Sequence, residues 1–128
     1  MKEKLIELLN NSHSPYSDFR VSAVLETKDG KEFVGVNVEN AAYGSSICAE
    51  RSARESAVSK GYKKHDFSKL YVMCDNSKIG MQCCACRQVF LELFDLDMQI
   101  ICMNPDGEEE MHTVRDLCPY PFNDEDLK

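Results

Sequence analysis

The sequence predicts an α/β domain in which helices cover a mixed sheet. Segments with strand-like and helix-like hydrophobic patterns alternate along the chain, and this alternation is typical of layered α/β domains. The pair Asp29-Gly30 lies between the first two strand-like segments and favours a two-residue hairpin turn. An opening hairpin is antiparallel, so the sheet is not purely parallel. The chain has 128 residues, 43% of them hydrophobic, which suits one core, and we expect a single domain over residues 1–128.

Two helices and two strands are expected in the first half of the chain. Leucine and isoleucine at helical spacing predict the first helix, and the apolar runs on either side of Asp29-Gly30 predict the strands. Ser45 or Ser46 is expected to cap the second helix, and Gly61 to end it. These elements cover residues 2–11, 19–27 and 32–38, and then the residues from Ser45 or Ser46 to about Lys60.

The second half is expected to contribute a buried strand, a helix with an apolar face and two further strands. Val89, Phe90, Leu93 and Phe94 recur at helical spacing and give the helix one face for the core. Pro105-Asp106-Gly107 favours a turn between the last two strands. The expected elements cover residues 67–74, about 83–94, 98–103 and 110–113, followed by one helical turn over 113–117.

Charge and composition exclude several classes of function. A formal net charge of −7 without a compensating block of Lys and Arg disfavours nucleic acid as a substrate or partner. The charged first residues and the lack of a long apolar run predict no signal peptide and no membrane span, and hence a cytoplasmic protein. The number of cysteines, seven, is odd, and no signal peptide is expected. The cysteines are therefore expected to be free thiols or metal ligands rather than a set of disulfides. Cys74 and Cys102 lie in apolar strand-like runs, where a buried inert thiol is the usual outcome.

Two short motifs bring together the residue types of a metal site. Cys83 and Cys86 form a C-x-x-C pair at the expected start of a helix, and this spacing places both sulfurs within reach of one ion. Cys48 is the best third ligand, because Glu50 follows two residues later and the first helical turn can direct both side chains toward the helix end. Three thiolates on Zn²⁺ would leave one tetrahedral position open for water, as in catalytic zinc sites.

The order C-A-E-R at residues 48–51 and C-x-x-C-R-Q at residues 83–88 resembles the cytidine deaminase family of zinc nucleoside deaminases. N-V-E-N at residues 37–40, Phe19 and L-C-P-Y-P-F at residues 117–122 are similar to segments of its small homotetrameric members. The resemblance covers nearly the whole chain. It implies a three-layer α/β/α fold with a mixed five-stranded sheet, one Zn²⁺ per chain, and a homotetramer with shared active sites.

A zinc ion bound by three thiolates would give Glu50 and two arginines their expected roles. Glu50 alone would be an ordinary carboxylate at a helix N-terminus, but beside a zinc with an open position it is the expected general base and acid. Arg51 and Arg87 lie in first turns, where a cation is usually unfavourable. Three thiolates would leave the site at about −1, and these arginines are expected to offset that charge. The alternative is that both point to solvent.

Six residues are expected to bind substrate on the basis of the resemblance. Asn37 and Glu39 lie on one face of their strand by its period of two, and the matching residues in the family bind ribose hydroxyls. The alternative is a solvated strand end. Phe19 is expected to pack on the pyrimidine ring, whereas the alternative for Phe19 and Phe122 is core packing. The set also includes Ala49 and, from a neighbouring subunit, Tyr43 and Phe122.

The chain differs from the usual family pattern near both motifs. Gln82 and Cys84 stand where the family usually has Pro and Gly, and Arg20 and Ser22 stand where Pro and Gly are common. Cys84 lies about 100° of helix away from Cys83 and should point away from the metal. These differences bear on substrate choice more than on the type of reaction.

The expected function is zinc-dependent hydrolytic deamination of cytidine and 2′-deoxycytidine to uridine and 2′-deoxyuridine, with release of ammonia, in pyrimidine salvage. A related alternative is a deaminase of a cytosine-containing antibiotic of the blasticidin type, although the N-V-E-N segment, which offers groups for a ribose, favours a nucleoside. Two alternatives from other classes are a non-catalytic zinc-binding module and a C-x-x-C redox protein. An open metal position beside Glu50 argues against the first, and a redox dithiol would need no third cysteine.

Overall fold

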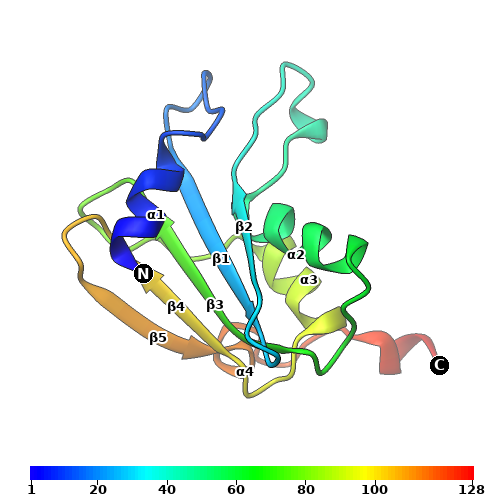
Figure 1. The fold of residues 1–128 in the computed structure, drawn as a ribbon. Helices are drawn as coiled ribbons and strands as arrows, with labels where there is room; N and C mark the ends of the chain where they lie inside the picture. The colour runs from blue at the N-terminus through cyan, green and yellow to red at the C-terminus, as the bar shows by residue number, and fades with distance from the viewer.

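A mixed sheet of five strands forms the centre of the structure, a computed structural model that describes all residues from 1 to 128 (Figure 1). The strands are β1 (Val21–Thr27), β2 (Glu32–Val36), β3 (Phe67–Cys74), β4 (Gln99–Met103) and β5 (Glu109–Thr113). Their order across the sheet is β2-β1-β3-β4-β5. β3 and β4 are parallel and the other neighbours are antiparallel, so the predicted mixed α/β sheet is confirmed.

Helices cover both faces of this sheet. They are α1 (Lys2–Leu9), α2 (Ala49–Ser59), α3 (Cys84–Leu93) and α4 (Val114–Leu117), with 3-10 turns at Tyr43–Ser45 and Asp124–Leu127. α1 lies across one face, whereas α2 and α3 lie on the other (Figure 1). The arrangement has the three layers of an α/β/α fold.

The apolar side chains form one cluster on each face of the sheet. On the α2 and α3 face, the ring of Phe67 packs edge-on against Phe94 with 5.3 Å between ring centroids, and Phe94 stacks on Phe90 at the same distance. The smaller cluster on the α1 face consists of Leu5, Leu9, Val24, Met73 and Met103. Because α1 has only 8 residues, burial of this leucine face must supply most of its stability.

The N-terminus of α2 differs from the sequence prediction. α2 begins at Ala49 with Cys48 as its N-cap, whereas Ser45 belongs to the 3-10 turn before it. Backbone hydrogen bonds of 3.0 Å join Val38 and Ile47 in both directions. They hold the segment before Cys48 extended, which prevents the helix from starting at the serines.

β2 and the C-terminal segment also depart from the prediction. β2 ends at Val36, two residues before its predicted end, because Val38 forms bridges with residues 13 and 47 and not with β1. The turn Asp124–Leu127, which Asn123 caps, was not predicted. The C-terminal residues project beyond α3 (Figure 1).

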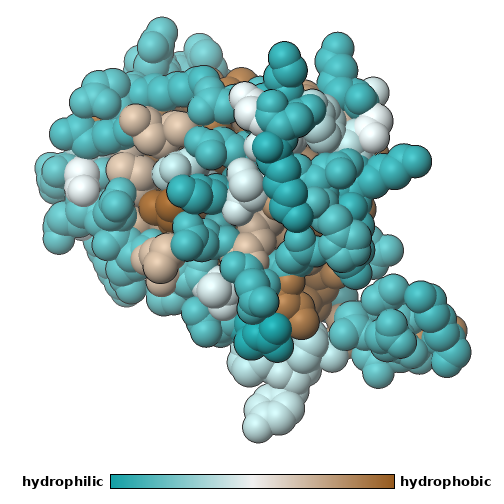
Figure 2. Space-filling model, turned by 60° about the horizontal axis from the view of Figure 1, so that its bottom comes forward, coloured by the Kyte–Doolittle hydropathy of each residue, from teal (hydrophilic) through white to brown (hydrophobic).

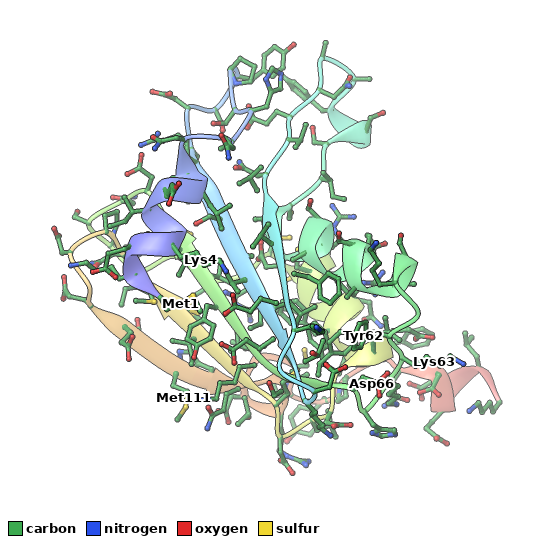
Figure 3. All side chains as sticks on the ribbon, viewed as in Figure 1. Met1, Lys4, Tyr62, Lys63, Asp66 and Met111 are labelled. Atoms are coloured by element: carbon green, nitrogen blue, oxygen red, sulfur yellow. The ribbon has the colours of Figure 1, made fainter.

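The end of the molecule that carries the β1–β2 turn is polar. Its surface is largely hydrophilic with small apolar areas (Figure 2). Tyr62 and Asp66 lie at this end (Figure 3), and the Tyr62 hydroxyl donates a 2.8 Å hydrogen bond to Asp29. On the α1 side, Lys4 forms an ion pair with Glu32 of β2.

None of the helices has both the length and the apolar character that crossing a bilayer requires.

Candidate metal centre and adjoining cavity

A glycine in β2 determines the position of α2. A Cβ atom on Gly35 would lie 2.4 Å from the Ala49 carbonyl oxygen and 2.6 Å from the Ala53 nitrogen. No side chain fits at these distances, so glycine is needed for the helix backbone to approach the strand this closely. This approach fixes the N-terminus of α2, which carries Cys48 and Glu50.

The three cysteines of the two motifs converge between α2 and α3. Cys48 and Cys83 are the N-cap residues of the two helices, and Cys86 lies buried in the first turn of α3. The sulfur atoms of Cys48, Cys83 and Cys86 all lie within 4.8 Å of one another. Cys84 is exposed and lies outside this group, as the helical spacing predicts.

The distances in this thiol cluster, Cys48, Cys83 and Cys86, suit a zinc ion. The Sγ atoms of Cys48 and Cys83 are 3.8 Å apart. Two sulfurs that bind one Zn²⁺ at about 2.3 Å with tetrahedral geometry are separated by about 3.8 Å. The donor set of three thiols is also one that zinc prefers. The residues present therefore fit the metal that the sequence predicts.

The groups around Cys48 favour its thiolate form. The neighbouring Cys86 thiol lowers the pKa of Cys48 to about 5, and Arg51 and Cys83 act in the same direction. The Arg51 Nη2 atom lies 3.9 Å from the Cys48 sulfur. The same pairing with Cys48, together with burial, raises the pKa of Cys86. These neighbours favour the thiolate form of Cys48 beside the Arg51 guanidinium group, and the charge-offsetting role of Arg51 stays a prediction.

Arg87 bonds to the backbone instead of the thiols. Its Nε donates to the Gln82 carbonyl oxygen at 2.9 Å, and its Nη1 donates to that of Leu117 at 3.2 Å. These bonds tie the start of α3 to the end of α4. Any effect of the Arg87 charge on the cluster would act without a direct hydrogen bond, and its charge-offsetting role stays a prediction.

Glu50 is buried next to the cluster and faces a cavity. Its side chain is 5% exposed, and the residue lines the cavity together with Cys48 and Cys83. Burial raises the pKa of the Glu50 carboxyl to about 7, and the negative charge of Cys48 adds to this rise. A carboxyl group with a pKa near neutrality is able both to accept and to release a proton. The position suits the acid–base role expected for this residue.

The cavity has a volume of about 420 Å³, which suits a small molecule. It lies at the end of the sheet where β1 begins and where β2 and β3 end. Five of the six residues expected to bind substrate line it, namely Phe19, Asn37, Glu39, Tyr43 and Ala49. Phe122 does not line the cavity of its own chain.

The Asn37 side chain is engaged within the chain. Its Oδ1 accepts hydrogen bonds from the Val21 amide at 2.9 Å and from the Ser12 hydroxyl, and its Nδ2 donates to the Phe19 carbonyl oxygen at 2.7 Å. Asn37 therefore joins β2 to the segment before β1. One amide hydrogen remains for another acceptor.

The Glu39 carboxylate holds the same loop. One oxygen accepts from the backbone amides of Tyr16 at 3.0 Å and Ser17 at 3.1 Å, and the other accepts from the Ser17 hydroxyl. The Ser17 hydroxyl bond is the main cause that lowers the pKa of Glu39, so this residue is ionised at neutral pH. Together Asn37 and Glu39 fix the loop that carries Phe19 to the cavity.

Three aromatic side chains expected at the site are exposed in the single chain. Phe19 is 41% exposed, Tyr43 74% and Phe122 57%, so core packing does not account for Phe19 or Phe122. The ring of Tyr43 touches Tyr16 edge-on with 5.8 Å between centroids. The Phe122 carbonyl oxygen accepts a 2.7 Å hydrogen bond from Gln88 of α3.

An apolar wall of the cavity was not predicted from the sequence. This wall includes Val21, Val72, Cys74 and Met81. Cys74 and Cys102 are buried, as expected, but Cys74 lines the cavity and Cys102 does not. The sequence carries no motif at these positions, and only the period of two along β1 and β3 could have indicated which side chains share the α2 face.

Comparison with known proteins gives consistent results. The family described as "Cytidine and deoxycytidylate deaminase zinc-binding region" matches residues 1–102. A probable cytidine deaminase of Dictyostelium discoideum is 43% identical over 98% of this chain and 86% of that protein. A cytidine deaminase of Halalkalibacterium halodurans is 38% identical over 98% of this chain and 93% of that protein. The crystal structure of cytidine deaminase from Burkholderia pseudomallei superposes with a TM-score of 0.89 at 38% identity, covering 94% of each chain.

Proposed function

Since this chain belongs to the cytidine and deoxycytidylate deaminase family, we propose that it hydrolyses cytidine and 2′-deoxycytidine to uridine and 2′-deoxyuridine with release of ammonia. Such a reaction serves pyrimidine salvage. The observation that carries the proposal is the buried Glu50 carboxyl, which faces a cavity of about 420 Å³ beside the thiol cluster.

One Zn²⁺ per chain is assigned to Cys48, Cys83 and Cys86. The 3.8 Å separation of the Cys48 and Cys83 sulfurs and the match to a zinc-binding region support this assignment. When bound, zinc supplies the Lewis acidity that makes water a nucleophile at neutral pH. The Cys86 thiol, and after it Arg51, lower the pKa of Cys48 and so favour the thiolate form that binds a cation.

Glu50 moves the protons of the reaction. As a carboxylate it takes a proton from the attacking water and, as a carboxylic acid, passes it to ring nitrogen N3. It then takes the second proton of the same oxygen, now a hydroxyl on C4, and passes it to the amino group, so that the C4–N bond breaks and ammonia leaves. A pKa of about 7 suits both steps, because neither form is strongly favoured at neutral pH. The buried position also keeps bulk water away from these transfers.

The cavity offers groups for each part of a nucleoside. Phe19 supplies an exposed ring face for the base. Ala49 supplies a backbone N–H at the N-terminus of α2, where the amides lack partners within the helix. The free hydrogen on Asn37 and the remaining acceptor capacity of Glu39 suit a ribose diol, which both accepts and donates hydrogen bonds.

The proposal includes a homotetramer whose subunits share active sites. Tyr43 and Phe122 are exposed in the single chain, and contact with a second copy would bury them near a cavity.

The proposed location is the cytoplasm, which the seven free cysteines support. Neither nucleic acid nor membrane is a proposed partner, in keeping with the net charge of −7.

Three other functions are alternatives. A deaminase of a cytosine-containing antibiotic would use the same metal and Glu50 but would not need a diol between Asn37 and Glu39. A non-catalytic zinc module gives no reason for a buried carboxyl beside the thiols. A dithiol redox centre would bind no metal. Substrate and metal measurements separate all three.

The test follows the ultraviolet absorbance of cytidine and 2′-deoxycytidine with purified protein of measured zinc content. Conversion to the uridine spectrum at about one zinc per chain is expected, and Cys48→Ala should abolish both the metal and the conversion. Cys84→Ala is the matched control, because Cys84 lies outside the thiol cluster. Zinc without conversion of either nucleoside would overturn the substrate, and conversion by zinc-free protein would overturn the site.

A further inference from the structure

The apolar wall of the cavity contains a thiol that the proposed chemistry does not use. Cys74 ends β3, is 6% exposed and lines the cavity. It does not belong to the thiol cluster. Burial raises the pKa of Cys74 to about 12, so the side chain stays neutral and contributes volume rather than charge.

Gly80 supports the Cys74 sulfur from behind. A Cβ atom on Gly80 would lie 2.6 Å from the Cys74 Sγ and 3.3 Å from its Cβ, with the edge of the Phe19 ring at 3.8 Å. The backbone of Gly80 therefore packs directly against the thiol. Gly80 does not line the cavity, so it lies on the side of the sulfur away from the cavity and limits how far the sulfur can move back when a ligand enters.

The proposed reaction fixes which edge of the base meets this wall. C4 of the ring must lie at the thiol cluster, and N3 must lie within reach of Glu50, which belongs to α2. C5 is the other ring neighbour of C4, so it faces away from Glu50. The apolar side chains that line the cavity outside α2 and the thiol cluster are those of Phe19, Val21, Tyr43, Ile47, Val72, Cys74 and Met81. Among these, the Cys74 sulfur is the atom against which Gly80 packs.

We propose that Cys74, supported by Gly80, limits the size of the substituent that the base carries at C5, so that the site accepts hydrogen and rejects methyl. This inference rests on the proposed function and adds a specificity-determining residue to it. A sulfur atom and a methyl group have similar sizes, and loss of the sulfur would open room for one methyl group.

The experiment compares kcat/KM for cytidine and 5-methylcytidine in the wild type and in Cys74→Ala. The ratio of 5-methylcytidine to cytidine is expected to rise by about 10-fold or more in the variant, which is the discrimination that one methyl group gives in an apolar pocket. Cys102→Ala is the matched control, because Cys102 is buried in the neighbouring β4 but does not line the cavity. Its ratio should equal that of the wild type.

Gly80→Ala provides a change in the opposite direction. The new Cβ forces the Cys74 sulfur forward into the cavity, and KM for cytidine is expected to rise. In the double variant Gly80→Ala/Cys74→Ala the new methyl occupies the place of the lost sulfur. Cytidine turnover should then recover relative to Gly80→Ala, as non-additivity of two residues in contact requires.

A ratio unchanged in Cys74→Ala, or raised equally in Cys102→Ala, would overturn the inference. Calorimetric titration with uridine and 5-methyluridine makes the same size comparison without turnover. A chain that binds uridine, discriminates against the methyl group through Cys74 and fails to deaminate cytidine would contradict the proposed function alone. Failure to bind either nucleoside would contradict both.

Discussion

Gly35 of β2 and Ala49 of α2 lie so close that a Cβ atom on Gly35 would meet the Ala49 carbonyl oxygen at 2.4 Å. Gly35→Ala must therefore push α2 away from the sheet. We expect it to lower the free energy of unfolding by about 1–3 kcal/mol, as overpacking does, and to reduce zinc binding because Cys48 moves with the helix. Chemical denaturation and metal analysis measure the two effects.

Gly44→Ala is the matched control for stability, since nothing lies within 4 Å of its Cβ position. It should unfold at the denaturant concentration of the wild type. Wild-type stability and zinc content in Gly35→Ala would contradict the view that this close approach positions α2.

Replacing any residue of the thiol cluster should remove the metal. Cys48→Ser, Cys83→Ser and Cys86→Ser each leave two sulfurs, and two sulfurs hold zinc much more weakly than three. Cys84→Ser should keep about one zinc per chain, because Cys84 lies outside the cluster. Elemental analysis after gel filtration gives the stoichiometry, and full zinc in Cys48→Ser would exclude the proposed ligand set.

Glu50→Gln should separate metal binding from turnover. The amide has nearly the size of the carboxyl but neither accepts nor releases the proton, so kcat should fall by about 10²–10⁴-fold. The zinc content should stay at the wild-type value, since the side chain of Glu50 is not part of the thiol cluster. Near-normal turnover in this variant would disprove the acid–base role.

The stability of the metal-free protein should depend on pH through Glu50. Its pKa is raised from 4.5 to about 7 by burial, so the folded state holds the proton more tightly than the unfolded state. The stabilisation is fully present below about pH 4.5 and is lost as the pH rises to about 7, by about 3 kcal/mol in total.

The measurement is the difference in unfolding free energy between the wild type and Glu50→Gln, in the presence of a chelator, from pH 4.5 to pH 8. The thiols titrate in both proteins and so largely cancel in the difference. A difference that does not change with pH would show that Glu50 titrates near its ordinary value in the folded chain.

The strands and helices could be predicted from the sequence because their apolar residues follow a regular period. The prediction of a strand over residues 67–74 agrees with β3 at both ends. The start of α2 could not be predicted in this way, because the bridge between Val38 and Ile47, which depends on tertiary pairing, overrides the capping preference of Ser45 and Ser46.

The candidate site, too, could be predicted only in part from the sequence. Helical spacing alone predicts that the sulfurs of Cys83 and Cys86 share one side. That Cys48 and Glu50 join them is expected from the needs of a catalytic zinc site and from the resemblance, because no local spacing connects the two motifs. The apolar wall was not predicted, because the alternation along β3 shows that Val72 and Cys74 share a face but not that this face borders a cavity. Likewise, nothing in the local sequence indicates that Asn37 bonds to Ser12, Val21 and Phe19.

The sulfurs of Cys48 and Cys83 belong to residues 35 positions apart in the chain. An ion bound to both closes α2 and β3 into a loop, much as a covalent cross-link would. For a loop of this length the lost entropy of the unfolded chain corresponds to about 4 kcal/mol. Chains that lack the ion would open more often and would be degraded faster. The supply of metal would then set the cellular abundance of the protein as well as its turnover.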